Sequence, residues 1–185
     1  MNNGTNQQYD AAVLLCRDIF LKKTRDYGTS WRVLRPISIA DQLYIKARRI
    51  RTLQEARQQR VEEDKTGEFR AMVNYGIIGL IQLSVPDTAP IEDVPADAAA
   101  QWYDEKAAIA RKTMLDKNHD YGEAWRDLSQ EGLVDLILMK ILRIRQIVAN
   151  EGKTLISEGI DSNFIDIINY SLFALILITE GKHSG

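Results

Sequence analysis

The chain repeats itself at a distance of 94 residues, and the repeat retains polar side chains as well as apolar ones. Segments 23–34 and 117–128 share the pattern Lys-x-x-Asp-Tyr-Gly-x-x-Trp-Arg-x-Leu. A period of this length exceeds the roughly 20–50 residues of solenoid repeats, so it indicates a duplicated, domain-sized unit. Further matched pairs, the last three after one added residue, are Asp41/Asp135, Lys46/Lys140, Arg49/Arg143, Arg51/Arg145, Phe69/Phe164, Asn74/Asn169 and Tyr75/Tyr170.

A cluster of prolines and acidic residues separates the two copies. Three of the four prolines, Pro86, Pro90 and Pro95, fall within ten residues, and segment 85–97 also carries four acidic side chains. Proline fixes φ and disfavours helix in the residue before it. We therefore expect a first repeat at 1–84, an acidic proline-rich linker at 85–97 and a second repeat at 98–185, the two repeats packed as one domain.

Each copy contains three segments with helical periodicity. We expect the first helices at about 8–25 and 98–118, the second at 38–60 and 130–150, and the third at 67–84 and 163–180. Ser38 is a candidate N-cap for one of them, with Asp41 three residues later as in a capping box. No alternating strand pattern bounded by turns occurs, so the chain is expected to be all-α.

Glycines mark the helix ends and the expected helix contacts. Gly28 and Gly122 follow the first helices, where a left-handed residue often ends a helix. Gly76 and Gly79 lie in an apolar helix and indicate a close approach by another helix. We expect the two apolar third helices to form the shared centre of a six-helix bundle with pseudo-twofold symmetry, an arrangement also compatible with a homodimer.

Composition excludes several classes of protein. The net charge of −2 argues against non-specific binding to nucleic acid, although residues 1–84 carry 14 basic against nine acidic side chains and favour an anion there. Cys16 is the only cysteine, which excludes an intrachain disulfide. The N-terminus is polar and the apolar run 164–178 is interrupted, so we expect no membrane-spanning segment. The expected location of the protein is the reducing cytoplasm.

A narrow polar stripe runs along segment 134–147, which is otherwise mostly apolar. Asp135, Lys140, Arg143 and Gln146 fall within about 140° around a helix of 3.6 residues per turn. One interpretation is that Asp135 and Arg143 pair with neighbouring helices and hold the bundle in register. The other is that Lys140 and Arg143 bind an anion, phosphate above all, because arginine supplies a bidentate fork and lysine a point charge.

The Lys-x-x-Asp-Tyr-Gly-x-x-Trp element places a base, an acid and two aromatic rings near a turn. The aromatic rings could stack on a nucleobase, and Asp120, Asp135 and Asp166 could ligate Mg²⁺ together with phosphate oxygens. The alternative is a structural corner with a buried tryptophan, which we favour for Trp31 and Trp125. Asp166 has Ala71 as its counterpart, so the copies are not equivalent.

These motifs resemble the nucleotide modification associated domain family, of which the chain looks like two tandem copies. The resemblance rests on Lys-Asn-His-Asp-Tyr-Gly-x-x-Trp from Lys117, on Asp-x-x-x-x-Lys-x-x-Arg-Ile from Asp135, and on Asn169-Tyr170. A more distant similarity is to the all-α nucleoside triphosphate pyrophosphatases of the MazG type, although their paired acidic motifs are not present here on consecutive helices. Both resemblances imply a helical fold and nucleotide chemistry.

Our hypothesis from the sequence is a nucleotide-handling protein that hydrolyses a nucleoside triphosphate or a modified nucleotide with Mg²⁺. The alternatives are a non-catalytic module that binds a nucleotide or a partner protein, and a purely structural helical dimer. The metal ligands would be Asp120, Asp135 and Asp166. The candidate substrate-binding residues are Lys117, Tyr121, Trp125, Lys140, Arg143, Asn169 and Tyr170, with Lys23, Tyr27, Trp31, Lys46 and Arg49 in the first copy.

Overall fold

A computed structural model describes residues 3–56, 64–86 and 94–185, and the regular secondary structure of these residues is all helical, with no strand. The linker predicted at 85–97 lies partly outside the described residues, as does the end of the helix predicted at 38–60. The helices of the described residues are α1 (Asn3–Tyr27), α2 (Pro36–Glu55), α3 (Lys65–Ser84), α4 (Ala96–Tyr121), α5 (Gln130–Ala149) and α6 (Ile160–Thr179), with short 3-10 helices η1 (Ser30–Val33) and η2 (Ala124–Asp127). The predicted all-α, internally duplicated fold is confirmed.

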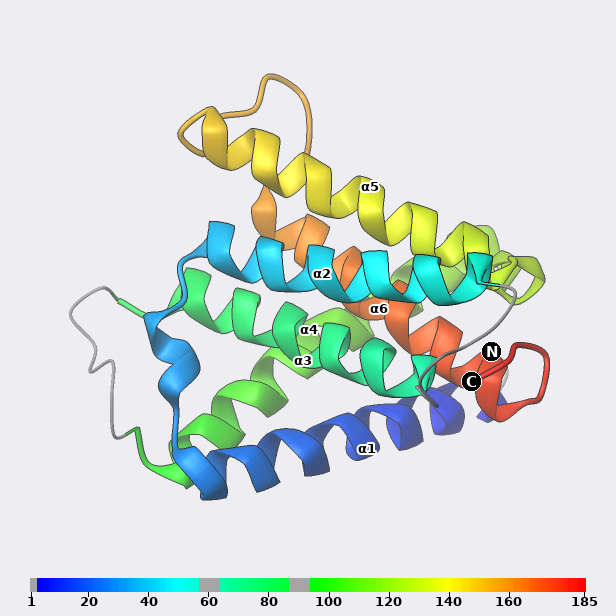
Figure 1. Ribbon diagram of the computed structural model, residues 1–185, viewed down its shortest axis with the longest axis horizontal. Coiled ribbons are helices and arrows are strands. Elements are labelled where there is room, and N and C mark those ends of the chain that lie inside the picture. The colour runs from blue at the N-terminus through cyan, green and yellow to red at the C-terminus, as the bar shows by residue number, and fades with distance from the viewer. Residues whose placement is uncertain (1–2, 57–63, 87–93) are drawn as a thin grey trace.

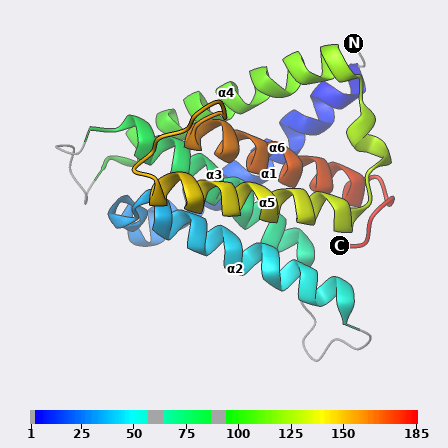
Figure 2. The same cartoon turned by 90° about the horizontal axis from the view of Figure 1, so that it is seen from above.

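The two apolar third helices form the centre of the bundle, as the sequence predicted. Helices α3 and α6 pack against each other more extensively than any other pair, with α2 and α5 on one side and α1 and α4 on the other (Figures 1 and 2). Helix α6 buries 14 of its 20 residues. An apolar surface of that extent requires cover on every side, which α3 and α1 of the other repeat supply together with α5 and α4 of its own.

Helix α6 is long and apolar enough, by length and composition, to cross a membrane. The apolar run is thus part of a 20-residue helix, longer than the sequence analysis allowed. In the structure 78% of its most apolar window is buried among the other helices. Such burial is what the core helix of a soluble protein also shows, so the helix is only weak evidence for a membrane span.

Local sequence explains where the helices end and begin. Gly28 and Gly122 have φ values of 68° and 66°, the left-handed conformation that glycine adopts without steric cost. The predicted N-cap at Ser38 is wrong: α2 begins at Pro36, and Ser38 lies inside its first turn. Proline favours this first helical position because its fixed φ suits a helix and its missing N–H is not needed there.

Polar contacts repeat across the pseudo-twofold axis. Arg17 pairs with Asp104 at 2.6 Å, and the equivalent Arg111 pairs with Asp10 at 2.7 Å, which joins α1 to α4. Between α2 and α5 the reciprocal pairs are Arg145–Asp41 at 2.7 Å and Arg51–Asp135 at 3.6 Å. The same two surface patches therefore meet each other, as in an isologous dimer interface.

Two buried tyrosines complete this symmetry inside the core. The Tyr9 hydroxyl donates to Oδ1 of Asn169 at 2.7 Å, and Tyr103 donates to Oδ1 of Asn74 at 2.8 Å. Each asparagine also donates to a backbone carbonyl of its own repeat, Asn74 to that of Cys16 at 3.0 Å and Asn169 to that of α4 at 3.1 Å. Each tyrosine thus bonds the other repeat, which ties the two copies together.

Substituting either tyrosine should test this mutual dependence. Tyr9→Phe leaves the buried Oδ1 of Asn169 without its donor, and Tyr103→Phe does the same to Asn74, so each should cost about 1–3 kcal/mol of unfolding free energy. Urea denaturation measures both costs, which pseudosymmetry predicts to be similar. A stability equal to that of the wild type for either variant would contradict the proposed role of these bonds.

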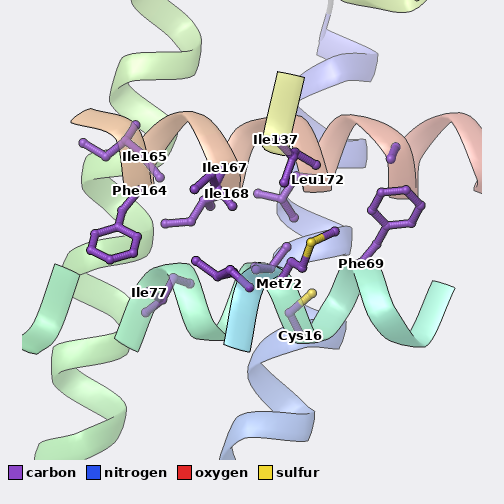
Figure 3. Packing of buried hydrophobic residues seen from close by; sticks show 14 of the residues in the cluster. Cys16, Phe69, Met72, Ile77, Ile137, Phe164, Ile165, Ile167, Ile168 and Leu172 are labelled. Carbon is purple, nitrogen blue, oxygen red and sulfur yellow. The ribbon is translucent and has the colours of Figure 1, made fainter. Parts of the chain in front are cut away.

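The close approach predicted at Gly76 and Gly79 is present. A Cβ at Gly79 would lie 2.8 Å from three ring carbons of Phe164, and one at Gly76 would lie 2.6 Å from Cγ1 of Ile168. Figure 3 shows Phe164 and Ile168 of α6 among the core side chains that meet α3, and it shows the buried Cys16 of α1 near Met72. Only glycine lets the two helices pack at this distance.

Gly79→Ala should therefore destabilise the bundle by about 1–3 kcal/mol, because the added methyl group pushes Phe164 off its position. Gly67→Ala in the same helix is the matched control, since no atom lies within 4 Å of its added Cβ. Thermal unfolding should show a lower melting temperature for Gly79→Ala and an unchanged or slightly higher one for Gly67→Ala. Equal melting temperatures would rule out the close contact.

Candidate functional site in the first repeat

A pocket of about 290 Å³ lies between α1, η1 and α3 in the first repeat. Lys23 and Tyr27 approach it from the end of α1, Trp31 from η1, and Arg70 and Tyr75 from α3. The sequence analysis selected Lys23, Tyr27 and Trp31 from one motif, and the structure brings all three to one pocket. Arg70 and Tyr75, more than 35 residues away in sequence, complete it.

The turn after α1 explains how one short motif faces a pocket. Gly28 reverses the chain, and η1 then places the Trp31 ring 6.0 Å from that of Phe20 on α1. Gln82 of α3 donates from Nε2 to the carbonyls of Arg32 and Leu34, both at 2.7 Å. The corner is thereby held against α3, and the apolar side chains between them form the inner wall of the pocket.

The two cations at this pocket lack ion-pair partners within the part of the chain that the structure describes. Lys23 and Arg70 each line the pocket and pair with no carboxylate there. Burial raises the pKa of the Cys16 thiol to about 12, and the positive charge of Arg70 opposes that rise. Lys23 and Arg70 therefore bring two positive charges to the pocket, and neither forms an ion pair with a described carboxylate.

Aromatic side chains gather at the same place. Burial raises the pKa of the Tyr27 hydroxyl, and the neighbouring Tyr75 and Asp26 raise it further. The Tyr27 side chain nevertheless remains exposed, and Trp31 is half-buried. The indole N–H of Trp31 is buried without an acceptor among the described residues, as is that of Trp125 in the second repeat.

In the second repeat the equivalent lysine is paired. Nζ of Lys117 donates to Oδ1 of Asp166 at 2.6 Å, and Nζ of Lys140 lies 2.7 Å from Oδ2 of the same carboxylate. Burial lowers the pKa of Lys117, but the hydrogen bond and negative charge of Asp166 outweigh burial and raise it. Asp166 and Lys140 are almost fully buried, with side chains 6% and 11% exposed.

In the first repeat, the cations of α2 pair with an acid of α3 that lies one helical turn before the position matching Asp166. Glu68 on α3 lies 3.3 Å from Nζ of Lys46 and 3.1 Å from Nη1 of Arg49. Glu68 corresponds to Asn163 in the second repeat, and Asp166 corresponds to Ala71. This displacement of the acid leaves alanine at the position that neutralises the lysine in the other copy, so Lys23 pairs with no carboxylate of the described residues.

The remaining candidates of the second repeat are dispersed. Trp125 is buried and stacks on Phe173 at 4.2 Å with an angle of 6° between the rings, whereas Tyr121 is 78% exposed. The Asn169 amide is already used in the core, because its Oδ1 accepts from Tyr9 and its Nδ2 donates to a backbone carbonyl of α4. Burial and the charge of Asp166 raise the pKa of Tyr170.

Lys140 and Arg143 face a different hollow, a wide groove beneath the loop between α5 and α6. Arg143 contacts Sδ of Met139 at 3.7 Å and has no carboxylate partner among the described residues. Glu151 and Glu158 also line this groove, as do two exposed apolar loop residues. The groove therefore mixes both signs of charge, and two of its three cations are already in ion pairs, Lys140 with Asp166 and Lys153 with Glu151.

The three carboxylates expected to bind Mg²⁺ do not form a metal site. Asp120 contacts His119 at the exposed end of α4, Asp135 lies near Arg51 on the surface, and Asp166 is bound by two lysines. No group of three or more histidine, cysteine, aspartate or glutamate side chains suited to a metal occurs in the described ranges. Each oxygen of Asp166 already lies 2.6–2.7 Å from a lysine ammonium group, so a Mg²⁺ ion there would have to approach two positive charges, and the donor set does not fit the ion.

Fold and sequence together define an internally duplicated, all-α module with a basic, aromatic pocket in one copy. The chain belongs to the nucleotide modification associated domain 1 family, whose model matches residues 23–83 and 117–178. The two matched regions confirm the tandem duplication. The chain matches no curated protein and no solved structure, and the distant similarity to MazG-type pyrophosphatases is not shown by these comparisons.

Sequence reasoning did not select Arg70, Ala71 or Ile78, all of which line the pocket. Each of the three was chemically different in the matching copy: the counterparts are Ile165, Asp166 and Phe173. The differences between the repeats at these three positions therefore mark the pocket, whereas the candidate residues were chosen mainly because they are identical in both copies.

Lys140→Ala should cost about 3–5 kcal/mol of stability, because it breaks a buried ion pair at Asp166. Lys117→Ala is the matched comparison: it removes a half-exposed cation from the same carboxylate and should cost at most about 1 kcal/mol. Urea denaturation of both variants measures the difference. Equal losses would show that Lys140 does not anchor α5 to α6.

Proposed function

We propose that this protein binds a nucleotide in the first-repeat pocket. The observation that carries the proposal is the presence of two cations without ion-pair partners among the described residues, Lys23 and Arg70, in one cavity with Tyr27, Trp31 and Tyr75. Its volume of about 290 Å³ is close to the lower limit for small-molecule sites, which range over about 300–1,000 Å³.

The charges suit the phosphate of a nucleotide. Arginine offers a planar fork of donors that matches phosphate oxygens, and lysine adds a compact charge. Neither cation is neutralised by a described carboxylate, so an anion bound between them would gain attraction without breaking an existing ion pair. The excess of basic residues in 1–84 favours the same sign of ligand.

The walls of the pocket suit a flat base. Phe20 and Ile78 present apolar surface, and Trp31 presents an indole ring at the edge of the same cavity. Stacking of a base on an aromatic side chain contributes about 1–3 kcal/mol in single-stranded nucleic acid complexes. The family description also supports a nucleotide, since it associates these domains with nucleotide modification.

The proposal assigns binding and no reaction. The expected Mg²⁺-dependent hydrolysis required Asp120, Asp135 and Asp166 to act together, and their contacts keep them apart. The side chains at the pocket provide positive charge, hydroxyl groups and aromatic surface, which are recognition groups. The non-catalytic nucleotide-binding module is therefore the form of the hypothesis that the geometry favours.

Binding can be tested by thermal unfolding against nucleoside mono-, di- and triphosphates, each with Mg²⁺ and with a chelator. A ligand at 100 times its Kd stabilises the folded state by about 2.7 kcal/mol, which raises the melting temperature measurably. We expect a rise that persists with the chelator. A panel in which no nucleotide raises the melting temperature would overturn the proposal.

Lys23→Ala should locate the site by weakening binding roughly tenfold or more, a change of about 1.4 kcal/mol. Its matched control is Lys22→Ala, which removes the same charge from the adjacent residue, one that pairs with Asp18 on the surface. Isothermal titration measures both affinities. Equal affinities in the two variants would place the ligand elsewhere.

A further inference from the structure

The two repeats carry the same Lys-x-x-Asp-Tyr-Gly-x-x-Trp motif, but different side chains of the third helix lie beside it. In the first repeat Ala71 and Ile78 of α3 line the pocket. At the matching positions α6 carries Asp166 and Phe173, and both side chains contact the motif directly. The second repeat therefore fills, with its own side chains, the region that is a pocket in the first.

Each filling side chain meets a motif residue that also lines the first-repeat pocket. The carboxylate of Asp166 receives Lys117, the counterpart of Lys23, at 2.6 Å. The ring of Phe173 lies parallel to that of Trp125, the counterpart of Trp31, at a centroid distance of 4.2 Å. One contact is ionic and the other is a stacked aromatic pair, as expected for a phosphate and a base.

We propose that Asp166 and Phe173 occupy, in the second repeat, the places that belong in the first repeat to the phosphate and the base of a nucleoside monophosphate. The second repeat is thus closed by an internal mimic of the ligand, and the chain binds one nucleotide. This inference rests on the proposed function and adds the orientation of the ligand: phosphate toward Lys23 and Arg70, base against Trp31.

The spacing of the two side chains limits the length of the ligand. Asp166 and Phe173, like Ala71 and Ile78, are seven residues apart on a helix, about 10 Å along its axis at a rise of 1.5 Å per residue. A single phosphate joined to a base through a sugar fits a span of this order. The small volume of the pocket favours the same choice over a triphosphate.

The difference at one more position fits a phosphate. Arg70 lines the first-repeat pocket, and its counterpart in the second repeat is the buried Ile165. Near neutral pH a phosphate monoester carries a charge of about −1.5 to −2 and three acceptor oxygens, more than a carboxylate offers. A second cation such as Arg70 is therefore useful in the first repeat, where the anion would be a phosphate. It is unnecessary in the second repeat, where the anion is the Asp166 carboxylate.

Ala71→Asp tests the inference by building the mimic into the first repeat. The probes are the common ribonucleoside and deoxynucleoside 5′-monophosphates and the matching triphosphates, measured by isothermal titration. The wild type should bind one equivalent of a monophosphate, more tightly than the triphosphate of the same base. Ala71→Asp should weaken this binding at least tenfold while keeping or raising the melting temperature, because the new carboxylate pairs with Lys23.

Two further variants separate charge from bulk. Ala71→Asn has nearly the same shape as Ala71→Asp without its charge, so it should weaken monophosphate binding much less. Ile78→Phe should weaken binding by filling the position of the base, and its melting temperature and circular dichroism spectrum would show whether it folds. Comparable losses in the Asp and Asn variants would overturn the assignment of the phosphate position.

The outcomes distinguish this inference from the proposed function. If Lys23→Ala weakens binding but Ala71→Asp binds as the wild type does, the pocket binds nucleotides and the mimic is wrong. A binding ratio of two, or tighter binding of triphosphates, would also overturn the inference and leave the pocket in place. If no nucleotide binds the wild type, the proposed function fails and the inference fails with it.

Discussion

The contact between α3 and α6 is the interaction on which the other features of this bundle depend. Gly76 and Gly79 let the ring of Phe164 and the side chain of Ile168 approach the α3 backbone, and the two most apolar helices thereby become one core. Each remaining helix packs on at least one of these two. The pocket is part of the same arrangement, because α3 provides one of its walls while burying its other face against α6.

Within this frame, the position of a single acid determines whether a lysine of the motif is available. Both repeats carry cations on the second helix that need a carboxylate on the third, and both have one. Asp166 reaches Lys140 and Lys117 together, whereas Glu68, one turn nearer the start of its helix, serves Lys46 and Arg49. The same local requirement is met in two ways, and only one of them leaves the motif lysine without an ion pair among the residues that the structure describes.

Much of the fold could be predicted from the sequence because its causes are local or periodic. The apolar periodicity predicted the helices, and Gly28 and Gly122 marked the ends of the first helix of each repeat. The duplication predicted that the two third helices pair about a pseudo-twofold axis. The start of α2 was misplaced because a polar residue with an acid three positions later outweighed a proline in the first helical position.

The candidate site was less accessible to the same reasoning. Identity between the two copies correctly indicated Lys23, Tyr27 and Trp31, which line the pocket. Asn169 is matched equally well, but its amide forms hydrogen bonds with Tyr9 and with the backbone of α4 in the core. Helical angles grouped Asp135 with Lys140, although the first is exposed and the second is nearly buried. Which matched polar residues face solvent, a cavity or the core depends on how six helices pack, and a period along one helix does not contain that information.

The bond between Tyr9 and Asn169 joins residues 160 positions apart, and it has a consequence for how the chain folds. Contacts of such long sequence separation form late, because closing a long loop costs entropy before any contact offsets it. During synthesis the first repeat leaves the ribosome with the apolar side of α3 uncovered, and its cover, α6, is made about 80 residues later. A nascent chain with exposed apolar surface is prone to association with other chains. The symmetric core therefore cannot form until the second repeat has been made. A molecular chaperone would be most useful in the interval between the synthesis of α3 and that of α6.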